Sequence, residues 1–223
     1  MEKRKIVFGT YDTALHGKWT LNAWAFSPAV QHTNFVTVPG RDGQLDLSTA
    51  LTDGEPRYDN RTLTVRLESS EGDRMEREAR IRTMINWLDG WSMDIFLPDH
   101  PLHYIKGRVH VAREFNDPAH CAVTVTATCE PWMYFKNERV YTLTAAATAK
   151  TAVLSNMGRR TAVPSVVVSG ANAEVKLVYG AASWVLSAGT YDLPDLALKQ
   201  GDVELQYSGT GTVVIAYREA VLE

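Results

Sequence analysis

The sequence lacks the features that mark membrane proteins and nucleic-acid binders. Its 223 residues include only two cysteines. The 23 lysines and arginines are outnumbered by 26 aspartates and glutamates, which gives a formal net charge of −3. Nucleic-acid binding domains usually carry a basic excess that neutralises phosphates, and this chain has none. The charged start is followed by no apolar stretch of signal-peptide length, and no run approaches the ~20 apolar residues of a membrane span. We therefore expect a chain that is made in the cytoplasm and has no membrane segment.

Motifs that carry catalysis are also missing. The sequence has no G-x-S-x-G nucleophile elbow, no phosphate-binding loop and no Cys-His pair suited to nucleophilic attack. Asp192 and Asp195 flank Pro194, but two carboxylates make a glycosidase only in a cleft of set geometry. We expect no catalytic residues, no cofactor-binding residues and no enzyme activity.

Four histidines are the candidates for a metal site: His100, His103, His110 and His120. Their spacing matches no standard zinc pattern, and no cysteine pair accompanies them. A metal site needs a set of converging ligands, whereas histidines in a loop beside a proline are ordinary. We expect no metal.

The two cysteines lie in one alternating run over residues 121–129. Eight residues along a strand separate Cys121 from Cys129 by about 26 Å. A disulfide needs Cα atoms within about 7 Å, so the two cannot pair within that strand. The run predicts two reduced, buried thiols on one face of a strand.

Alternation of apolar and polar residues, the pattern of a half-buried strand, dominates the first half of the chain. It is clear over residues 63–67, 109–111 and 121–129, where threonines fill the polar positions of the last run. The tight loop Gly40–Gly43 lies between strand-like residues. A G-x-x-G loop can clamp a nucleic-acid backbone, but that use favours basic neighbours and a following helix, so the pattern predicts a turn.

One segment has the spacing of an amphipathic helix instead. From Arg74 to about Asp89, apolar residues recur on one helix face. The predicted stripe consists of Ile81, Met84, Ile85 and Leu88. Asp73 fits an N-cap with Glu76 three residues on, and Gly90 fits a C-terminal stop.

The composition shifts after residues 131–136 toward Val, Gly, Ser and Thr, which predicts a domain boundary between Phe135 and Tyr141. Short strands follow at close spacing, and alternation on both sides of residues 208–211 predicts a hairpin. The predicted strands cover residues 166–168, 175–179, 184–186, 203–207 and 213–217. Such spacing is typical of a β-sandwich or jelly roll.

Aromatic residues of the second half decide between a packed core and a sugar-binding face. Tyr207 and Tyr217 share parity with the neighbouring Val, Leu and Ile positions, so they are expected to face the core. Trp184 is expected to do the same. A sugar-binding sandwich would need aromatics on an exposed face.

A series of short motifs follows in order along nearly the whole chain. The motifs are VPGRDGQLDLS at 38–48, YDNRTLTV at 58–65, INWLDG at 85–90, YIKGRV at 104–109, EPWMY at 130–134, Asn156-Met157-Gly158, Pro164 and a turn at Gly201. This ordered set resembles the distal tail proteins of long-tailed bacteriophages.

The resemblance implies a mainly β fold in two domains. Residues 1–137, with one helix at about 74–89, would build a ring of six copies at the distal end of the tail tube. Residues 138–223 would form a galectin-like sandwich that carries adhesion parts. The implied partners are other copies of the chain, the tail tube protein, the tail-tip or baseplate hub protein and receptor-binding proteins. DNA would pass through the ring without specific binding, and the protein would reside in the virion tail.

Three alternatives remain open at this point. The second half can be a carbohydrate-binding adhesion module that acts alone. The chain can be another tube or hub subunit with a similar N-terminal fold. The enzyme alternative is a cell-wall hydrolase, although no acid pair in a suitable context is visible.

Overall fold

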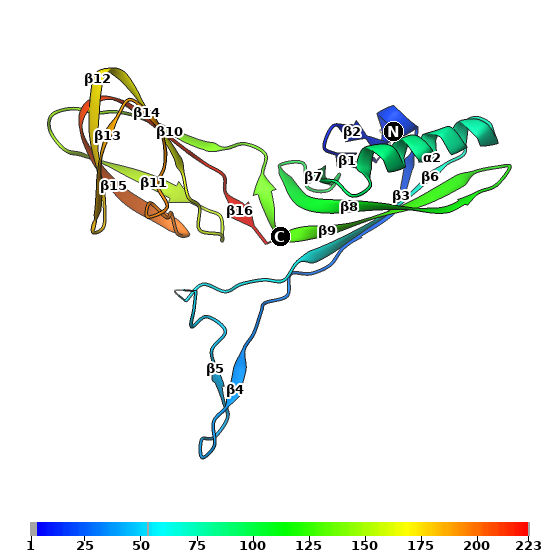
Figure 1. Ribbon diagram of the computed structural model, residues 1–223, viewed down its shortest axis with the longest axis horizontal. Coiled ribbons are helices and arrows are strands. Elements are labelled where there is room, and N and C mark those ends of the chain that lie inside the picture. Colours follow the sequence, from blue (N-terminus) through cyan, green and yellow to red (C-terminus); the bar gives the residue numbers. More distant parts are fainter. Residues whose placement is uncertain (1–3, 53, 223) are drawn as a thin grey trace. The chain divides into compact units, whose positions relative to one another are not determined.

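The computed structural model describes residues 4–52 and 54–222. Within those ranges the chain forms sixteen strands and two helices, so the predicted mainly β fold is confirmed (Figure 1). The chain divides into two compact units, the first ending at Met133 and the second beginning at Tyr134. Neither of the helices found in the described ranges is long and apolar enough to cross a membrane.

The first unit is built on one antiparallel sheet with strand order β2-β1-β7-β8-β9-β6-β3. These strands are β1 (Val7–Phe8), β2 (Tyr11–Asp12), β3 (Thr20–Phe26), β6 (Arg61–Ser69), β7 (Ser92–Phe96), β8 (His103–Asn116) and β9 (Cys121–Phe135). The last two residues of β9 belong to the second unit. In β6 and β9 one face is buried and the other carries mostly threonine and charged residues. The apolar residues of the alternating sequence pattern thus face the core, and the polar residues between them face solvent.

Both cysteines lie on β9 and are buried and free, as predicted. Their side chains share the buried face with Val123, Val125 and Ala127. Burial raises the pKa of both thiols, and that of Cys129 to about 12.

The predicted helix is confirmed as α2 (Arg74–Leu88). Its capping box is complete, because the Asp73 carboxylate accepts from the Glu76 N–H at 2.8 Å and the Glu76 carboxylate accepts from the Asp73 N–H at 3.3 Å. Ile81, Met84 and Leu88 are buried, and α2 packs against β8. Ile85 is only half-buried, which corrects the predicted stripe.

Arg77 takes the fourth buried position, which the apolar spacing did not reveal. It lies one turn before Ile81 on the same face. Its guanidinium donates to the carbonyls of Gly72, Asp117 and Pro118. The buried charge therefore ties the start of α2 to the turn between β8 and β9. A short helix, α1 (Thr13–Gly17), was also not expected from the sequence.

Between β3 and β6 the chain forms a separate two-stranded sheet (Figure 1). Among the residues that the structure describes, strands β4 (Phe35–Thr37) and β5 (Gln44–Asp46) pair only with each other. The loop Gly40–Gly43 joins them, which confirms the predicted turn. We call residues 27–60 the arm.

In the second unit, two long strands each belong to two layers. The strands are β10 (Arg139–Thr144), β11 (Lys150–Asn156), β12 (Ser165–Tyr179), β13 (Ala182–Ser187), β14 (Gly189–Asp192), β15 (Gly201–Tyr217) and, near the end of the chain, β16 (Ala220–Val221). The first half of β12 pairs with β14 and with the second half of β15, which also pairs with β10. The second half of β12 pairs with β13 and with the first half of β15, which also pairs with β11. The predicted sandwich is therefore confirmed as two layers made largely by bending two strands.

The predicted hairpin at residues 208–211 is wrong, because β15 runs through this segment as one bent strand. Buried residues keep the same parity before and after the bend, from Leu205 to Val213, as a continuous strand requires. The predicted strands 166–168 and 175–179 are likewise one strand, β12, with a bulge between Ser169 and Glu174. Gly209 and Gly211 supply the bend, since a Cβ at Gly209 would clash with the Glu174 carbonyl oxygen.

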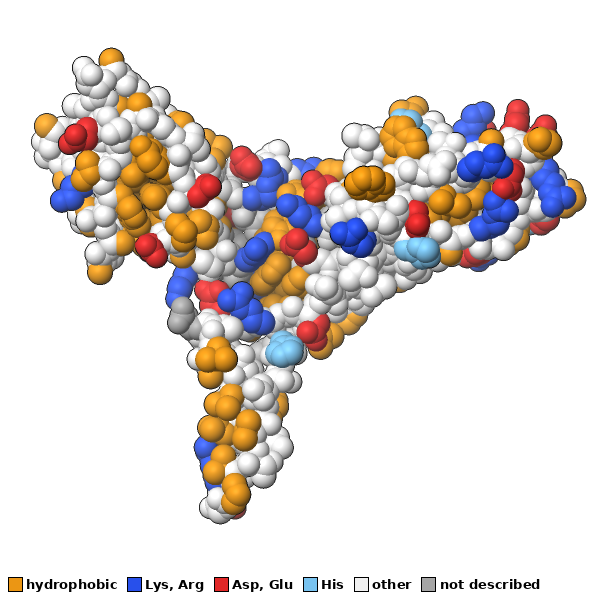
Figure 2. Space-filling view, viewed as in Figure 1, with side chains coloured by type: hydrophobic (Ala, Val, Ile, Leu, Met, Phe, Trp, Pro, Cys, Tyr) orange, Lys and Arg blue, Asp and Glu red, His pale blue; other side chains and the backbone are white. Residues whose placement is uncertain are grey.

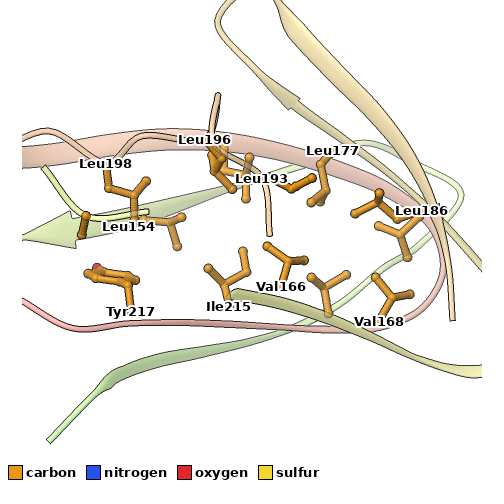
Figure 3. Close-up of a cluster of buried hydrophobic side chains, with 14 of the residues drawn as sticks. Leu154, Val166, Val168, Leu177, Leu186, Leu193, Leu196, Leu198, Ile215 and Tyr217 are labelled. Carbon is orange, nitrogen blue, oxygen red and sulfur yellow. The ribbon is translucent and has the colours of Figure 1, made fainter. Parts of the chain in front are cut away.

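Figure 3 shows the core between the two layers, where Leu177 and Leu196 lie across from Val166 and Ile215. Tyr217 is buried in this core, as predicted. Tyr207 and Trp184 are partly buried and pack against it, so the expectation for these two holds only in part.

Replacement of Leu88 by alanine tests the buried face of α2. Leu88 is 1% exposed, so Leu88→Ala is expected to lower the free energy of unfolding by about 2–5 kcal/mol through lost burial and a cavity. Chemical denaturation measures the change. Asn86→Ala, at an exposed position of the same helix, is the control. Equal stability of Leu88→Ala and the native chain would contradict the packing described.

A pair of glycine substitutions tests the bend in β15. Gly209 and Gly201 both have positive φ, +119° and +109°, but only Gly209 is crowded by the facing strand. Gly209→Ala is therefore expected to destabilise the protein by about 1–3 kcal/mol more than Gly201→Ala, since the clash must be relieved by a backbone shift. Thermal and chemical unfolding give the difference. Equal effects would mean that the bend does not need a bare Cα.

Candidate functional site

The structure does not gather the candidate metal ligands into one site. His110 lies 2.7 Å from the Asp89 carboxylate, and the His120 ring lies 3.3 Å from that of Asp117. The His100 ring packs edge-on against Trp24. Across residues 4–52 and 54–222, no group of three His, Cys, Asp or Glu side chains is arranged to hold a metal ion.

One depression on the first unit is lined in part by a buried thiol. It has a volume of about 370 Å³ and lies beside Gly107, with Lys106, Arg108, Cys129 and Glu130 among its lining residues. Cys129 is the only thiol there, and burial raises its pKa to about 12. A thiol with that pKa stays protonated at neutral pH, and the thiolate is the nucleophilic form. This depression therefore offers no thiol nucleophile.

The arm is held firmly where it leaves the sheet. Arg61 is buried, and its guanidinium carbon lies 3.6 Å from the centre of the Phe26 ring. Its Nε donates to the Ser27 carbonyl at 2.6 Å, and the Thr62 N–H donates to the Ser27 hydroxyl at 2.8 Å. A cation stacked on an aromatic face and bonded to a carbonyl fixes the backbone on both sides of the root.

Backbone pairing continues outward from this root. The Asp59 N–H donates to the Val30 carbonyl at 2.9 Å, and the His32 N–H donates to the Arg57 carbonyl at 2.8 Å. Tyr58 packs edge-on against Trp132, with ring centres 5.5 Å apart. Near its root, the arm therefore consists of two segments that are hydrogen-bonded to each other, and it is not an irregular loop there.

Apolar side chains of the arm face water. Phe35 is 52% exposed and Leu51 is 99% exposed. The other exposed apolar residues of the arm are Val30, Val36, Val38 and Leu47. A two-stranded sheet has no core of its own, so these side chains are not buried by the arm itself, and large exposed apolar patches on proteins mark interaction sites. The sequence resemblance included residues 38–48, but alternation alone did not show that they stand apart from the main sheet.

Aromatic residues of the second unit mostly support its own backbone. The Tyr217 hydroxyl donates to the Ser155 carbonyl at 2.6 Å, and the Tyr141 hydroxyl accepts from the Ser155 N–H at 3.0 Å. Tyr179 and Tyr191 donate to the carbonyls of Ala197 and Ser187. Burial raises the pKa of Tyr217. The hydroxyl groups of these tyrosines therefore stabilise the backbone of the sandwich.

The Asn-x-Gly motif of the second unit is also structural. Asn156 is fully buried, and its side-chain amide donates to the carbonyls of Leu198 at 2.8 Å and Arg160 at 3.0 Å. Its side-chain oxygen accepts from the Gly158 N–H at 2.9 Å. A Cβ at Gly158 would lie 2.7 Å from the backbone of Ala220, so this position needs a bare Cα. The motif thus pins the last strand segment against the sandwich.

Comparisons with known proteins identify the fold. No family model and no curated protein matches the sequence. The crystal structure of the SPP1 Dit (gp 19.1) protein, described as a paradigm of the hub adsorption apparatus in phages that infect Gram-positive bacteria, does match. The TM-score is 0.70 at 17% sequence identity, and the match covers 98% of this chain and 99% of that chain. The two proteins share a fold over nearly their whole length, as the sequence resemblance implied.

Replacement of Arg61 by methionine tests how the arm is held. Methionine keeps much of the volume but removes the cation and leaves the Ser27 carbonyl without this donor, at a cost of about 1–3 kcal/mol. Limited proteolysis is expected to cut the arm faster in Arg61→Met than in the native chain. The exposed Arg57→Met is the control. Unchanged cleavage of the arm would show that Arg61 does not secure its root.

Proposed function

We propose that this protein is a structural subunit of a bacteriophage tail. It forms a ring at the distal end of the tail tube and joins the tube to the tail tip or baseplate hub and to host-adhesion proteins. The observation that carries the proposal is the fold shared end to end with a protein of a phage hub adsorption apparatus. The virion tail is then its location, after synthesis in the host cytoplasm.

The arm supports assembly as the mode of action. Its exposed apolar residues have no partner surface within the described part of the chain, and burial of apolar area drives association. A closed ring is built from head-to-tail contacts between two different surfaces of each copy. We assign these contacts to residues 1–137, which include the arm, and propose six copies per ring on the strength of the family resemblance.

Charge is consistent with a passage for DNA. The formal net charge is −3, so the ring carries no overall basic excess that would hold phosphates. A conduit needs weak contacts with its cargo. We propose that DNA crosses the ring without specific binding.

The second unit, proposed as the domain at residues 138–223, serves as a docking body for receptor-binding proteins. The hydroxyl groups of Tyr179, Tyr191 and Tyr217 donate to backbone carbonyls of the same unit, and Tyr217 is buried. Sugar-binding sites stack sugar rings on exposed aromatic faces, so these tyrosines favour docking over glycan binding. No catalytic role is proposed, since neither motif nor geometry in the described residues favours one.

Electron microscopy and light scattering of the purified full chain test this proposal. A closed ring with a mass of six copies is expected, and it should persist at high salt because apolar contacts are not screened. A strict monomer at high protein concentration would contradict the proposal. Long open tubes would instead favour a tail tube subunit.

A further inference from the structure

The last residues of the chain bind the segment through which the chain enters the second unit. We call residues 134–138, which precede β10, the entry segment, and residues 218–221, which follow β15, the clasp. The Phe135 N–H donates to the Glu219 carbonyl at 3.1 Å. The Arg218 guanidinium donates to the Phe135 carbonyl at 2.7 Å and to the carbonyl of the following residue at 2.6 Å. The clasp thus holds the backbone of the entry segment.

The clasp also holds the bend at residues 157–160, which follows β11. Glu219 is 6% exposed, and its carboxylate accepts from the Met157 N–H at 2.8 Å and lies 3.2 Å from the Arg139 guanidinium. A carboxylate buried this deeply is stable only while such partners are present. The carbonyl of the next residue, Ala220, accepts from the Arg159 N–H at 2.9 Å. Figure 2 shows side chains of both charges on the surface around β16.

The hydrophobic core of the sandwich does not depend on the clasp. The buried members of this core lie between Leu154 and Tyr217, the last residue of β15 (Figure 3). The contacts that hold the clasp to the entry segment and to the bend are hydrogen bonds and an ion pair. Segments held in this way open locally at a lower free energy than core strands do. The sandwich can therefore stay folded when the clasp opens.

We propose that the clasp opens as one unit while the sandwich stays folded, and that its opening frees the entry segment. Glu219 bonds the entry segment through its carbonyl and the bend through its carboxylate, so the two attachments are lost together. When the clasp is closed, the backbone that tethers the second unit is fixed. When it is open, that tether is flexible and the sandwich is intact. All of these contacts lie within the second unit, so the inference is independent of the proposed ring.

Two full-length variants open the clasp in different ways. Arg218→Met removes the guanidinium that bonds the entry segment and keeps much of the side-chain volume. Gly158→Ala places a Cβ 2.7 Å from the backbone of Ala220, so the clasp must move away from the bend. The control is Glu204→Gln, which removes one charge at an exposed position in the first half of β15.

Hydrogen exchange, measured by mass spectrometry, reports the opening of each segment. In the native chain the entry segment and the bend are expected to exchange at similar rates, and both faster than the buried first half of β12. In Arg218→Met both segments are expected to exchange about tenfold faster than in the native chain, since a hydrogen bond from a charged donor is lost. Gly158→Ala is expected to act in the same direction. In both variants β12 is expected to keep its native rate, and Glu204→Gln is expected to match the native chain throughout.

Three results would overturn the inference. If β12 exchanges faster together with the entry segment in Arg218→Met, the clasp unfolds with the sandwich and does not open alone. If the bend exchanges faster but the entry segment keeps its native rate, the clasp does not hold the entry segment. If neither variant changes the exchange of either segment, the clasp contacts are not what protects them. Light scattering of the same samples tests the ring separately, and a native chain that stays monomeric would contradict the proposed function alone.

Discussion

The pairing of β6 with β9 is the interaction on which the first unit depends. The two strands stay in register from Arg61 opposite Cys129 to Ser69 opposite Cys121. Because side chains alternate between the two faces of a strand, a slip of one residue would move the whole buried row of β6 into water. The same register sets what lies beyond each end of β6. The arm enters at Arg61, and α2 follows Ser69 through the capping box at Asp73.

Much of this arrangement could be predicted from local pattern. Alternation identified β6 and β9, and the single-face placement of Cys121 and Cys129 followed from it. The cap at Asp73 and the apolar spacing identified α2 to within a residue of its observed end. The burial of Arg77 was not predicted, because an arginine does not contribute to an apolar pattern. Its burial depends on three carbonyl partners, two of which lie about forty residues away in the sequence.

The features that the sequence could not reveal depend on which strands pair with each other. Residues 203–217 have the same local pattern whether they form a hairpin or one bent strand, since glycines serve both. The choice is made by β12, which pairs along both halves of β15. The arm has the same ambiguity, because β4 and β5 resemble any two strands of a sheet until the absence of a third partner among the described residues is known. The exposed apolar surface of the arm is likewise visible only in the fold.

The two long strands of the second unit have a mechanical consequence. Since β12 and β15 each run through both layers, neither layer can be peeled from the other without pulling a continuous backbone through the bend. A tensile load applied to an outer strand such as β10 or β13 passes directly into both layers. The sandwich should therefore yield in a single abrupt event and not layer by layer.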